Sequence, residues 1–301
     1  MWVADIDGSN ARQVVAGGWS GELSPDGRRV TYHVRAENDT DDPSLYVHDV
    51  GGGKPRLIPG GIGAVWSPDG SQLAVDDGKT LFLIDVNSGK RRELAHRVAL
   101  RGFSFAPDGN ALAYARADRR PEHEYESDVF VLRLSDEKTE QVTHDGHSDS
   151  PVWGGSWIVY RHFRFVNDDH WPSIGELWLM HPDGSAARSF AKGRENLSQA
   201  QWGLDPLEIS GDGKRLLACN ACEFSCTPVG FTVPDGKHHE LAVEGERGMI
   251  PFGSELSRDG TEVLVEMAPF DGYGERAYAV PFEGGRARLL VKQGASPSWA
   301  R

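Results

Sequence analysis

A four-residue turn motif that recurs along the chain is the feature that most restricts the fold. Its five copies are Ser24–Gly27, Ser67–Gly70, Ala106–Gly109, Ser210–Gly213 and Ser257–Gly260. Each copy ends in Asp-Gly and lies between two short apolar segments. The Asp can hydrogen-bond the turn backbone, and the Gly can adopt the positive φ that closes the turn. The motif therefore predicts a series of β-hairpins with tight turns.

The spacing of these turns predicts a repeat of about 40 to 50 residues. Successive motif aspartates are 43, 39, 104 and 47 residues apart, so the long gap should contain a degenerate copy. The segment Pro151–Tyr160 fits this copy, because apolar runs flank its Gly154-Gly155 pair. A second apolar hairpin follows each first one, as at Leu81–Val86. Four strands in a repeat of this length are typical of a β-propeller blade.

The strand count favours seven blades and allows six. The chain contains seven second hairpins, six first hairpins and an opening strand at Ser296–Ala300, one strand fewer than seven complete blades need. We therefore predict an all-β propeller, a single domain over residues 1–301, closed by N- and C-terminal strands that share a blade. The strand that this blade lacks would precede Trp2, so we expect the natural chain to begin upstream of Met1.

The repeats resemble those of TolB-type propellers, also called PD40 or WD40-like repeats, over essentially the whole chain. This resemblance implies the fold and leaves the function open, because the same repeat occurs in the propellers of S9 prolyl peptidases and oligogalacturonate lyases. A peptidase would need a serine nucleophile. The sequence has no Gly-x-Ser-x-Gly motif, and the nearest segment, Trp171–Gly175, lacks the first glycine.

Charge and hydropathy restrict the partners and the compartment. The 32 Lys and Arg residues are outnumbered by 45 Asp and Glu residues, which gives a net charge of −13. Nucleic-acid binding is not expected, since phosphates need a basic surface. Neither a signal peptide nor a membrane span is visible, so the sequence as written indicates a cytoplasmic protein, expected to be a monomer. A missing upstream signal peptide would make it periplasmic or extracellular.

Long insertions are expected on one face of the propeller, which we call the long-loop face. They are residues 35–43, 116–128, 162–176, 220–229 and 267–275. Connections between second and third strands open there, together with those between blades. We expect this face to bind a protein or peptide through an acidic rim with aromatic contacts, without catalysis and without a cofactor, and the acidic rim favours a cationic partner. The expected contact residues are Asp41, Asp42, Glu122, Glu124, Tyr125, Phe163, Asp168, Asp169, His170, Trp171 and Tyr273, with Glu37 and Asp39 extending the rim.

An alternative function is a carbohydrate-active or metal-assisted lyase or hydrolase on the same face. Its candidate residues are His144, His147, His162 and His170, and three of them would have to converge on a divalent metal. The segment His144–Asp149 is better explained as a connector between blades, because Asp, Ser and Gly are ordinary turn formers.

The three cysteines, Cys219, Cys222 and Cys226, lie close together in the sequence. They could supply thiolates to zinc if His238 or His239 came near. Structural zinc sites usually use two separated ligand pairs, so a disulfide or free thiols are favoured over a metal.

Overall fold

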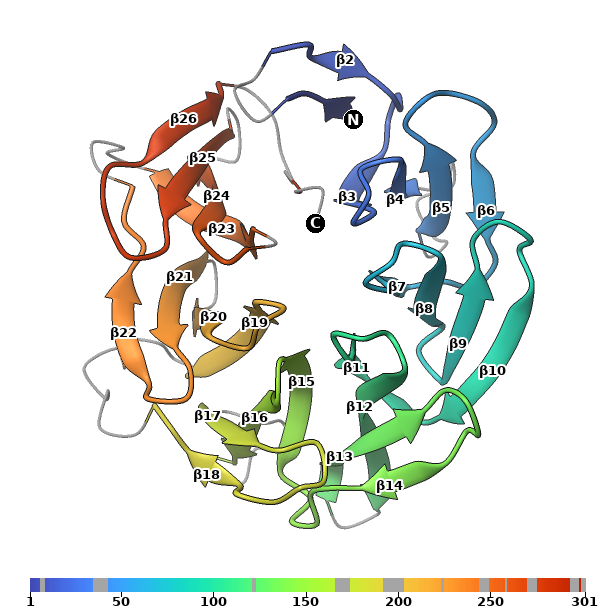
Figure 1. Cartoon of the computed structure of the whole chain (residues 1–301), viewed down its shortest axis with the longest axis vertical. Helices are drawn as coiled ribbons and strands as arrows, with labels where there is room; N and C mark the ends of the chain where they lie inside the picture. The colour runs from blue at the N-terminus through green and yellow to red at the C-terminus, as the bar shows by residue number, and fades with distance from the viewer. Residues whose placement is uncertain are drawn as a thin grey trace.

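The chain forms a ring of antiparallel β-sheets arranged around a central axis (Figure 1). A computed structural model describes residues 1–5, 9–34, 43–120, 123–165, 174–191, 203–222, 225–243, 249–257, 259–269, 275–292 and 298. Every regular element within these residues is a β-strand. No helix long and apolar enough to cross a membrane occurs in this part of the chain. The all-β propeller fold is therefore confirmed.

Six of the sheets have four strands each, and we call them blades 1 to 6 in chain order. Blade 1 contains β3 (Trp19–Leu23), β4 (Arg29–Val34), β5 (Ser44–Asp49) and β6 (Arg56–Ile58). Blade 2 contains β7 (Gly63–Trp66), β8 (Gln72–Asp76), β9 (Thr80–Asp85) and β10 (Arg91–His96). Blade 3 contains β11 (Val98–Phe105), β12 (Ala111–Arg120), β13 (His123–Arg133) and β14 (Thr139–Gln141).

The other three blades repeat this meander, with each strand hydrogen-bonded to the next along the chain. Blade 4 contains β15 (Ser148–Gly154), β16 (Trp157–Arg164), β17 (Ile174–Met180) and β18 (Arg188–Ser189). Blade 5 contains β19 (Leu204–Ile209), β20 (Arg215–Cys222), β21 (Ser225–Thr232) and β22 (Lys237–Glu240). Blade 6 contains β23 (Met249–Leu256), β24 (Glu262–Pro269), β25 (Arg276–Pro281) and β26 (Arg288–Val291). The first hairpin of blade 4 is the predicted degenerate copy.

The sector of the ring between blades 6 and 1 holds a smaller sheet, in which β1 (Trp2–Val3) pairs with β2 (Arg12–Gln13) (Figure 1). Ser298 lies on the inner side of this sector, because its Oγ accepts a hydrogen bond from the Leu23 amide and lies 3.4 Å from Glu255 Oε1. The described residues thus form six complete blades, the smaller number that the sequence allows. The preferred number, seven complete blades, is not reached among them.

The turn motif has the predicted backbone geometry. The glycines Gly70, Gly109 and Gly155 have φ values of 69°, 72° and 53°. In the turn of blade 2, Asp69 Oδ1 accepts hydrogen bonds from Ser67 Oγ at 2.7 Å and from the Ser71 amide at 3.0 Å. The Ser67 hydrogen bond is the main reason that the pKa of Asp69 lies below its usual value. The Asp closes its own turn, which explains its recurrence in the motif.

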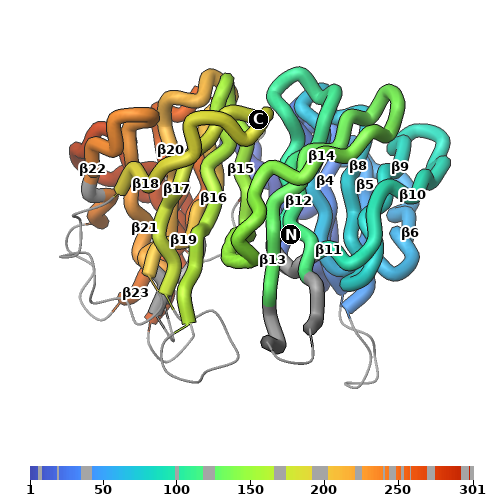
Figure 2. The backbone as a smooth tube through the Cα atoms, turned by 90° about the horizontal axis from the view of Figure 1, so that it is seen from below, coloured from blue at the N-terminus to red at the C-terminus, as the bar shows by residue number. Residues whose placement is uncertain are grey.

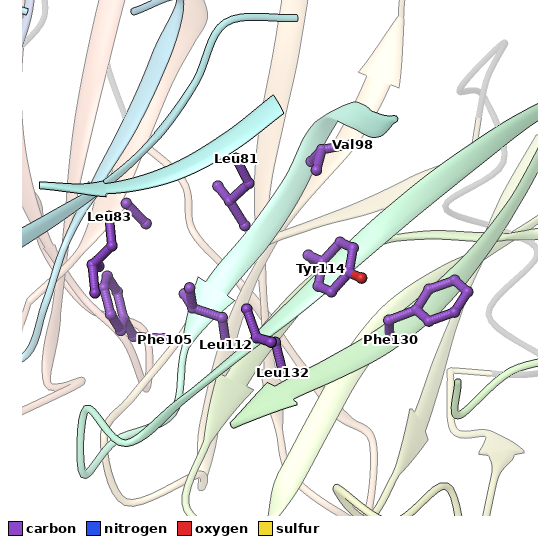
Figure 3. Packing of buried hydrophobic residues seen from close by; sticks show 9 residues of the cluster. Leu81, Leu83, Val98, Phe105, Leu112, Tyr114, Phe130 and Leu132 are labelled. Atoms are coloured by element: carbon purple, nitrogen blue, oxygen red, sulfur yellow. The ribbon is translucent and has the colours of Figure 1, made fainter. Parts of the chain in front are cut away.

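The hydrophobic core lies between adjacent blades. Figure 3 shows one such cluster, where Leu81 and Leu83 of blade 2 face Leu112 of blade 3. Both faces of a blade are covered by neighbours, so inner strands such as β8 and β9 are almost continuously apolar. Of the aromatic and aliphatic residues before the turns, Trp66, Phe105 and Leu256 are buried as expected.

The second strand of each blade ends, and the third strand begins, at the long-loop face, which is the lower face in Figure 2. Two of the expected insertions are largely regular hairpins instead. The ladder between β12 and β13 continues to the pair Arg120–His123, and the ladder between β20 and β21 continues to Cys222–Ser225. Backbone pairing continues because a two-residue connection suffices at each end. This part of the face is therefore built from strands that project beyond the sheet.

Candidate functional site

A cavity of about 820 Å³ lies along the axis of the ring and forms a central channel. Its wall contains residues from the first strand of every blade, as the inner position of these strands in Figure 1 suggests. Pro25, Pro68 and Pro107 of the turn motif line it on the face opposite the long-loop face. Because the first strand of every blade lies beside the channel, the repeat places equivalent residues around one ring.

One side of the channel is acidic. The residue two positions before the motif serine is glutamate in three blades, namely Glu22 in blade 1, Glu208 in blade 5 and Glu255 in blade 6. Blades 5, 6 and 1 follow one another around the ring, with the β1–β2 sector between blades 6 and 1. Glu266 of β24 adds a fourth carboxylate and is buried. Among the described residues that line the channel, none is Lys or Arg. We call Glu22, Glu208 and Glu255 the acidic arc.

The other side of the channel is largely apolar. At the position of the acidic arc, blades 2, 3 and 4 carry Val65, Ser104 and Val152. Trp66, Phe103 and Trp153 also line this side. The channel therefore offers negative charge on one wall and aromatic and aliphatic surface on the other. An extended segment with basic and apolar side chains on opposite edges would match both walls.

Residues at this repeat position also join neighbouring blades. Ser104 Oγ of blade 3 accepts a hydrogen bond from the Trp153 amide of blade 4 at 3.1 Å. Glu208 Oε2 of blade 5 accepts one from the Leu256 amide of blade 6 at 2.6 Å. Side chains, rather than a backbone ladder, thus link the first strands of these blades.

Most of the contact residues predicted from the sequence lie outside the described residues. These are Glu37, Asp39, Asp41, Asp42, Glu122, Asp168, Asp169, His170, Trp171 and Tyr273. The backbone of Glu124 and Tyr125 belongs to β13. Phe163 was expected to contribute contact area, but its side chain is fully buried. It packs against His147 and Phe165, because residues on β16 alternate between the two faces of blade 4.

The acidic arc was missed in the sequence analysis, although the signal was present. Glu22, Glu208 and Glu255 each stand two residues before a motif serine. Superposing the repeats on their turns would have shown three carboxylates at one structural position, facing the channel.

Two of the four histidines of the proposed enzyme site lie close together. The rings of His147 and His162 are 6.2 Å apart, and His162 Nε2 lies 2.9 Å from Asp145 Oδ2. This contact is the main reason that the pKa of Asp145 lies well below its usual value. His162 also stacks on Trp178 with a centroid distance of 4.6 Å. The pair fixes the connector between blades 3 and 4 to β16.

Metal ligation has no support in the described part of the chain. No group of three or more His, Cys, Asp or Glu side chains there is arranged to hold a metal ion. His33 is the single histidine among the described channel residues, and its Nε2 contacts the Ile62 carbonyl at 2.9 Å. His170 lies outside the described residues. The lyase or hydrolase hypothesis therefore stays a prediction.

Two of the three cysteines form a disulfide, one of the alternatives favoured over a metal site. Cys219 of β20 and Cys226 of β21 are joined across adjacent strands, with their Cα atoms 5.3 Å apart. Two thiolates of the suggested zinc set are consumed by this bond. Cys222 lies at the end of β20, and its side chain is outside the described set.

A buried ion-pair network supports the long-loop face beneath blades 4 and 5. Arg161 of β16 makes a bidentate contact with Asp149 of β15, at 2.7 Å and 2.6 Å. Its Nε also lies 3.1 Å from Asp205 Oδ1 of β19 in the next blade. The space for the arginine comes from Gly175, where a Cβ would lie 2.6 Å from Arg161 Cδ. We call Arg161, Asp149 and Asp205 the inter-blade triad.

Comparisons with known proteins identify the fold and no closer relationship. No family model and no curated protein sequence matches the chain. Among solved structures, the β-propeller domain of the Trilobed protease from Pyrococcus furiosus matches with a TM-score of 0.69 and 13% identity, over 98% of this chain and 87% of that one. TolB from Acinetobacter baumannii matches with a TM-score of 0.61 and 16% identity, over 92% and 67%.

An oligogalacturonate lyase in complex with manganese matches with a TM-score of 0.60 and 14% identity, over 90% of this chain and 76% of that one. The resemblance to TolB-type propellers is thus confirmed for the fold. The similar structures include a lyase and a protease, so the fold itself does not distinguish a binding protein from an enzyme.

Proposed function

We propose that this propeller is a non-catalytic binding protein that receives a cationic segment of a protein or peptide at its channel, entering from the long-loop face. The observation that carries the proposal is the acidic arc, with no Lys or Arg among the described channel residues. The net charge of −13 acts in the same direction, because it raises the local concentration of a cationic partner. The partly exposed Phe103 and Trp153 of the apolar wall supply surface that is removed from water on binding.

Binding of a short fluorescein-labelled peptide of alternating lysine and alanine, followed by fluorescence anisotropy, tests the proposal. We expect saturable binding that weakens as salt rises, because screening acts over about 8 Å at physiological ionic strength. The same peptide with glutamate in place of lysine should not bind.

A matched pair of variants separates the channel from the overall charge. Glu22→Gln with Glu255→Gln removes two carboxylates from the acidic arc, whereas Glu137→Gln with Glu176→Gln removes two that do not line the channel. The first variant should bind the lysine peptide more weakly by on the order of tenfold, since a tenfold change corresponds to about 1.4 kcal/mol. Equal weakening in both variants would mean that only net charge attracts the peptide and that the channel is not the site.

A further inference from the structure

A second cavity, of about 410 Å³, lies on the outer part of the ring between blades 2 and 3. It is lined by His96 of β10, by Arg97 in the connector that follows, and by Arg116 of β12. The remaining lining residues are Leu94, Ala95, Tyr114 and Thr139. The described lining carries basic groups and no carboxylate, which is the reverse of the channel. We call this cavity the basic groove.

Arg116 is held in a fixed orientation by an aromatic platform. Its Cζ lies 4.0 Å from the centroid of the Phe130 ring, and Phe130 in turn stacks on Tyr114 at 5.5 Å. Figure 3 shows Tyr114 and Phe130 side by side on neighbouring strands. When a guanidinium stacks with its face on an aromatic ring, its N–H groups point outward in its own plane. They can then donate hydrogen bonds to an oxyanion.

Comparison with a second stacked arginine shows what is unusual about Arg116. Arg91 stacks over Phe82, but its guanidinium also lies 3.7 Å from Asp77 Oδ2 and donates to the Pro59 carbonyl. For Arg116, no carboxylate among the described residues lies within the 4.0 Å ion-pair distance. The charge of Arg91 is therefore paired with Asp77, whereas Arg116 has no carboxylate partner among the described residues.

Two acidic side chains close to the basic groove have partners within the protein. Asp128 stands opposite Arg116 in the β12–β13 ladder, and it accepts hydrogen bonds from Thr143 Oγ1 at 2.9 Å and from the Gly146 amide at 3.1 Å. Glu93 pairs at 2.9 Å with His96 of the groove lining itself. Neither carboxylate forms an ion pair with Arg116.

We propose that the basic groove binds a small organic oxyanion, a carboxylate or a phosphate carried on an apolar or aromatic body. Arg116 donates to the anionic group, and Arg97 and His96 line the groove beside it. The partly buried side chain of Leu94 contacts the apolar body. A cavity of this volume is within the range of small-molecule sites. This site is separate from the channel and takes a ligand of opposite charge, so it does not depend on the proposed function.

Ligand-observed fluorine NMR of the full chain tests the proposal with 4-fluorobenzoate and 4-fluorophenyl phosphate, with neutral 4-fluorobenzamide as the control. We expect saturable broadening for at least one of the two anions and none for the amide. Binding of only one anion supports the site and identifies which oxyanion it prefers.

Three variants locate the binding. Arg116→Gln should weaken it by on the order of tenfold, the effect of losing one charge-assisted contact. Arg116→Lys, which keeps the charge without the planar fork, should bind with intermediate affinity. Arg133→Gln removes an exposed arginine that pairs with Asp136 and should bind as the wild type does. No saturable binding of either anion, or equal binding by Arg116→Gln and Arg133→Gln, would overturn the proposal.

Discussion

Replacing the arginine of the inter-blade triad by methionine gives the sharpest test of how blades 4 and 5 are held together. Methionine has a similar length and no charge, so Arg161→Met leaves Asp149 and Asp205 without their common cation. Their side chains are 1% and 14% exposed, against 16% for Arg161. Removing one partner of a buried ion pair costs about 3 to 5 kcal/mol, because the remaining charge stays buried and uncompensated.

The expected loss is measurable by thermal unfolding. For a protein of this size each kcal/mol corresponds to about 2 to 4 °C in Tm, so we expect Arg161→Met to lower the Tm by roughly 10 °C at neutral pH. Arg133→Met is the matched control, because Arg133 contacts Asp136 at 2.8 Å with both side chains about half exposed. Exposed pairs contribute about 0 to 1 kcal/mol, so this control should lose little.

The size of the loss relative to the control decides the outcome. A loss of Tm in Arg161→Met no larger than that in Arg133→Met would refute this account of how blades 4 and 5 are held together.

The turn motif and the connector between blades 3 and 4 give two further predictions. Gly70→Val should lower the free energy of unfolding by about 1 to 2 kcal/mol in urea titrations, because φ is positive there, whereas Gly51→Val, at a position with no atom within 4 Å of the added Cβ, should be nearly neutral. Asp145→Asn should cost about 1 kcal/mol at neutral pH, a value reduced for the partial exposure of the pair. Its lowered pKa means that the stabilisation is present above the ordinary carboxyl pKa and is lost on acidification, so the wild-type and Asp145→Asn curves should converge as the pH falls below about 4. Equal losses for the two glycine variants, or a constant Asp145→Asn deficit, would contradict these predictions.

The architecture could be predicted because it is encoded locally. The hairpin turns depend on four adjacent residues, and even the degenerate Gly154-Gly155 copy kept enough of the pattern to be found. The inter-blade triad could not be predicted in this way, since it joins residues 149, 161 and 205 from three strands of two blades. The stack of Arg116 on Phe130 likewise depends on the register between β12 and β13, which the turn motif does not specify.

Two expectations failed for a common physical reason. Phe163 was assigned to a binding surface because it was expected to lie in a long insertion, residues 162–176, but β16 continues through it and directs its side chain into the core. The expected insertion that contains Glu124 is a hairpin extension for most of its length. In both cases the strands extend farther than the repeat length suggests, since backbone pairing continues wherever the partner strand also continues.

The hydrogen bonds from Ser104 and Glu208 to the next blade have a consequence for how such a ring can change during evolution. The first strands of blades 3 and 5 are each joined to the next blade through a side chain at one repeat position, where blades 2 and 4 carry valine. The bore of the channel is therefore set by residues that no blade needs for its own hydrogen-bond ladder. Substitutions at this single position can widen or narrow the channel and change its charge, while the β-sheet of each blade is kept. The channel can therefore adapt to a different ligand without a change of fold.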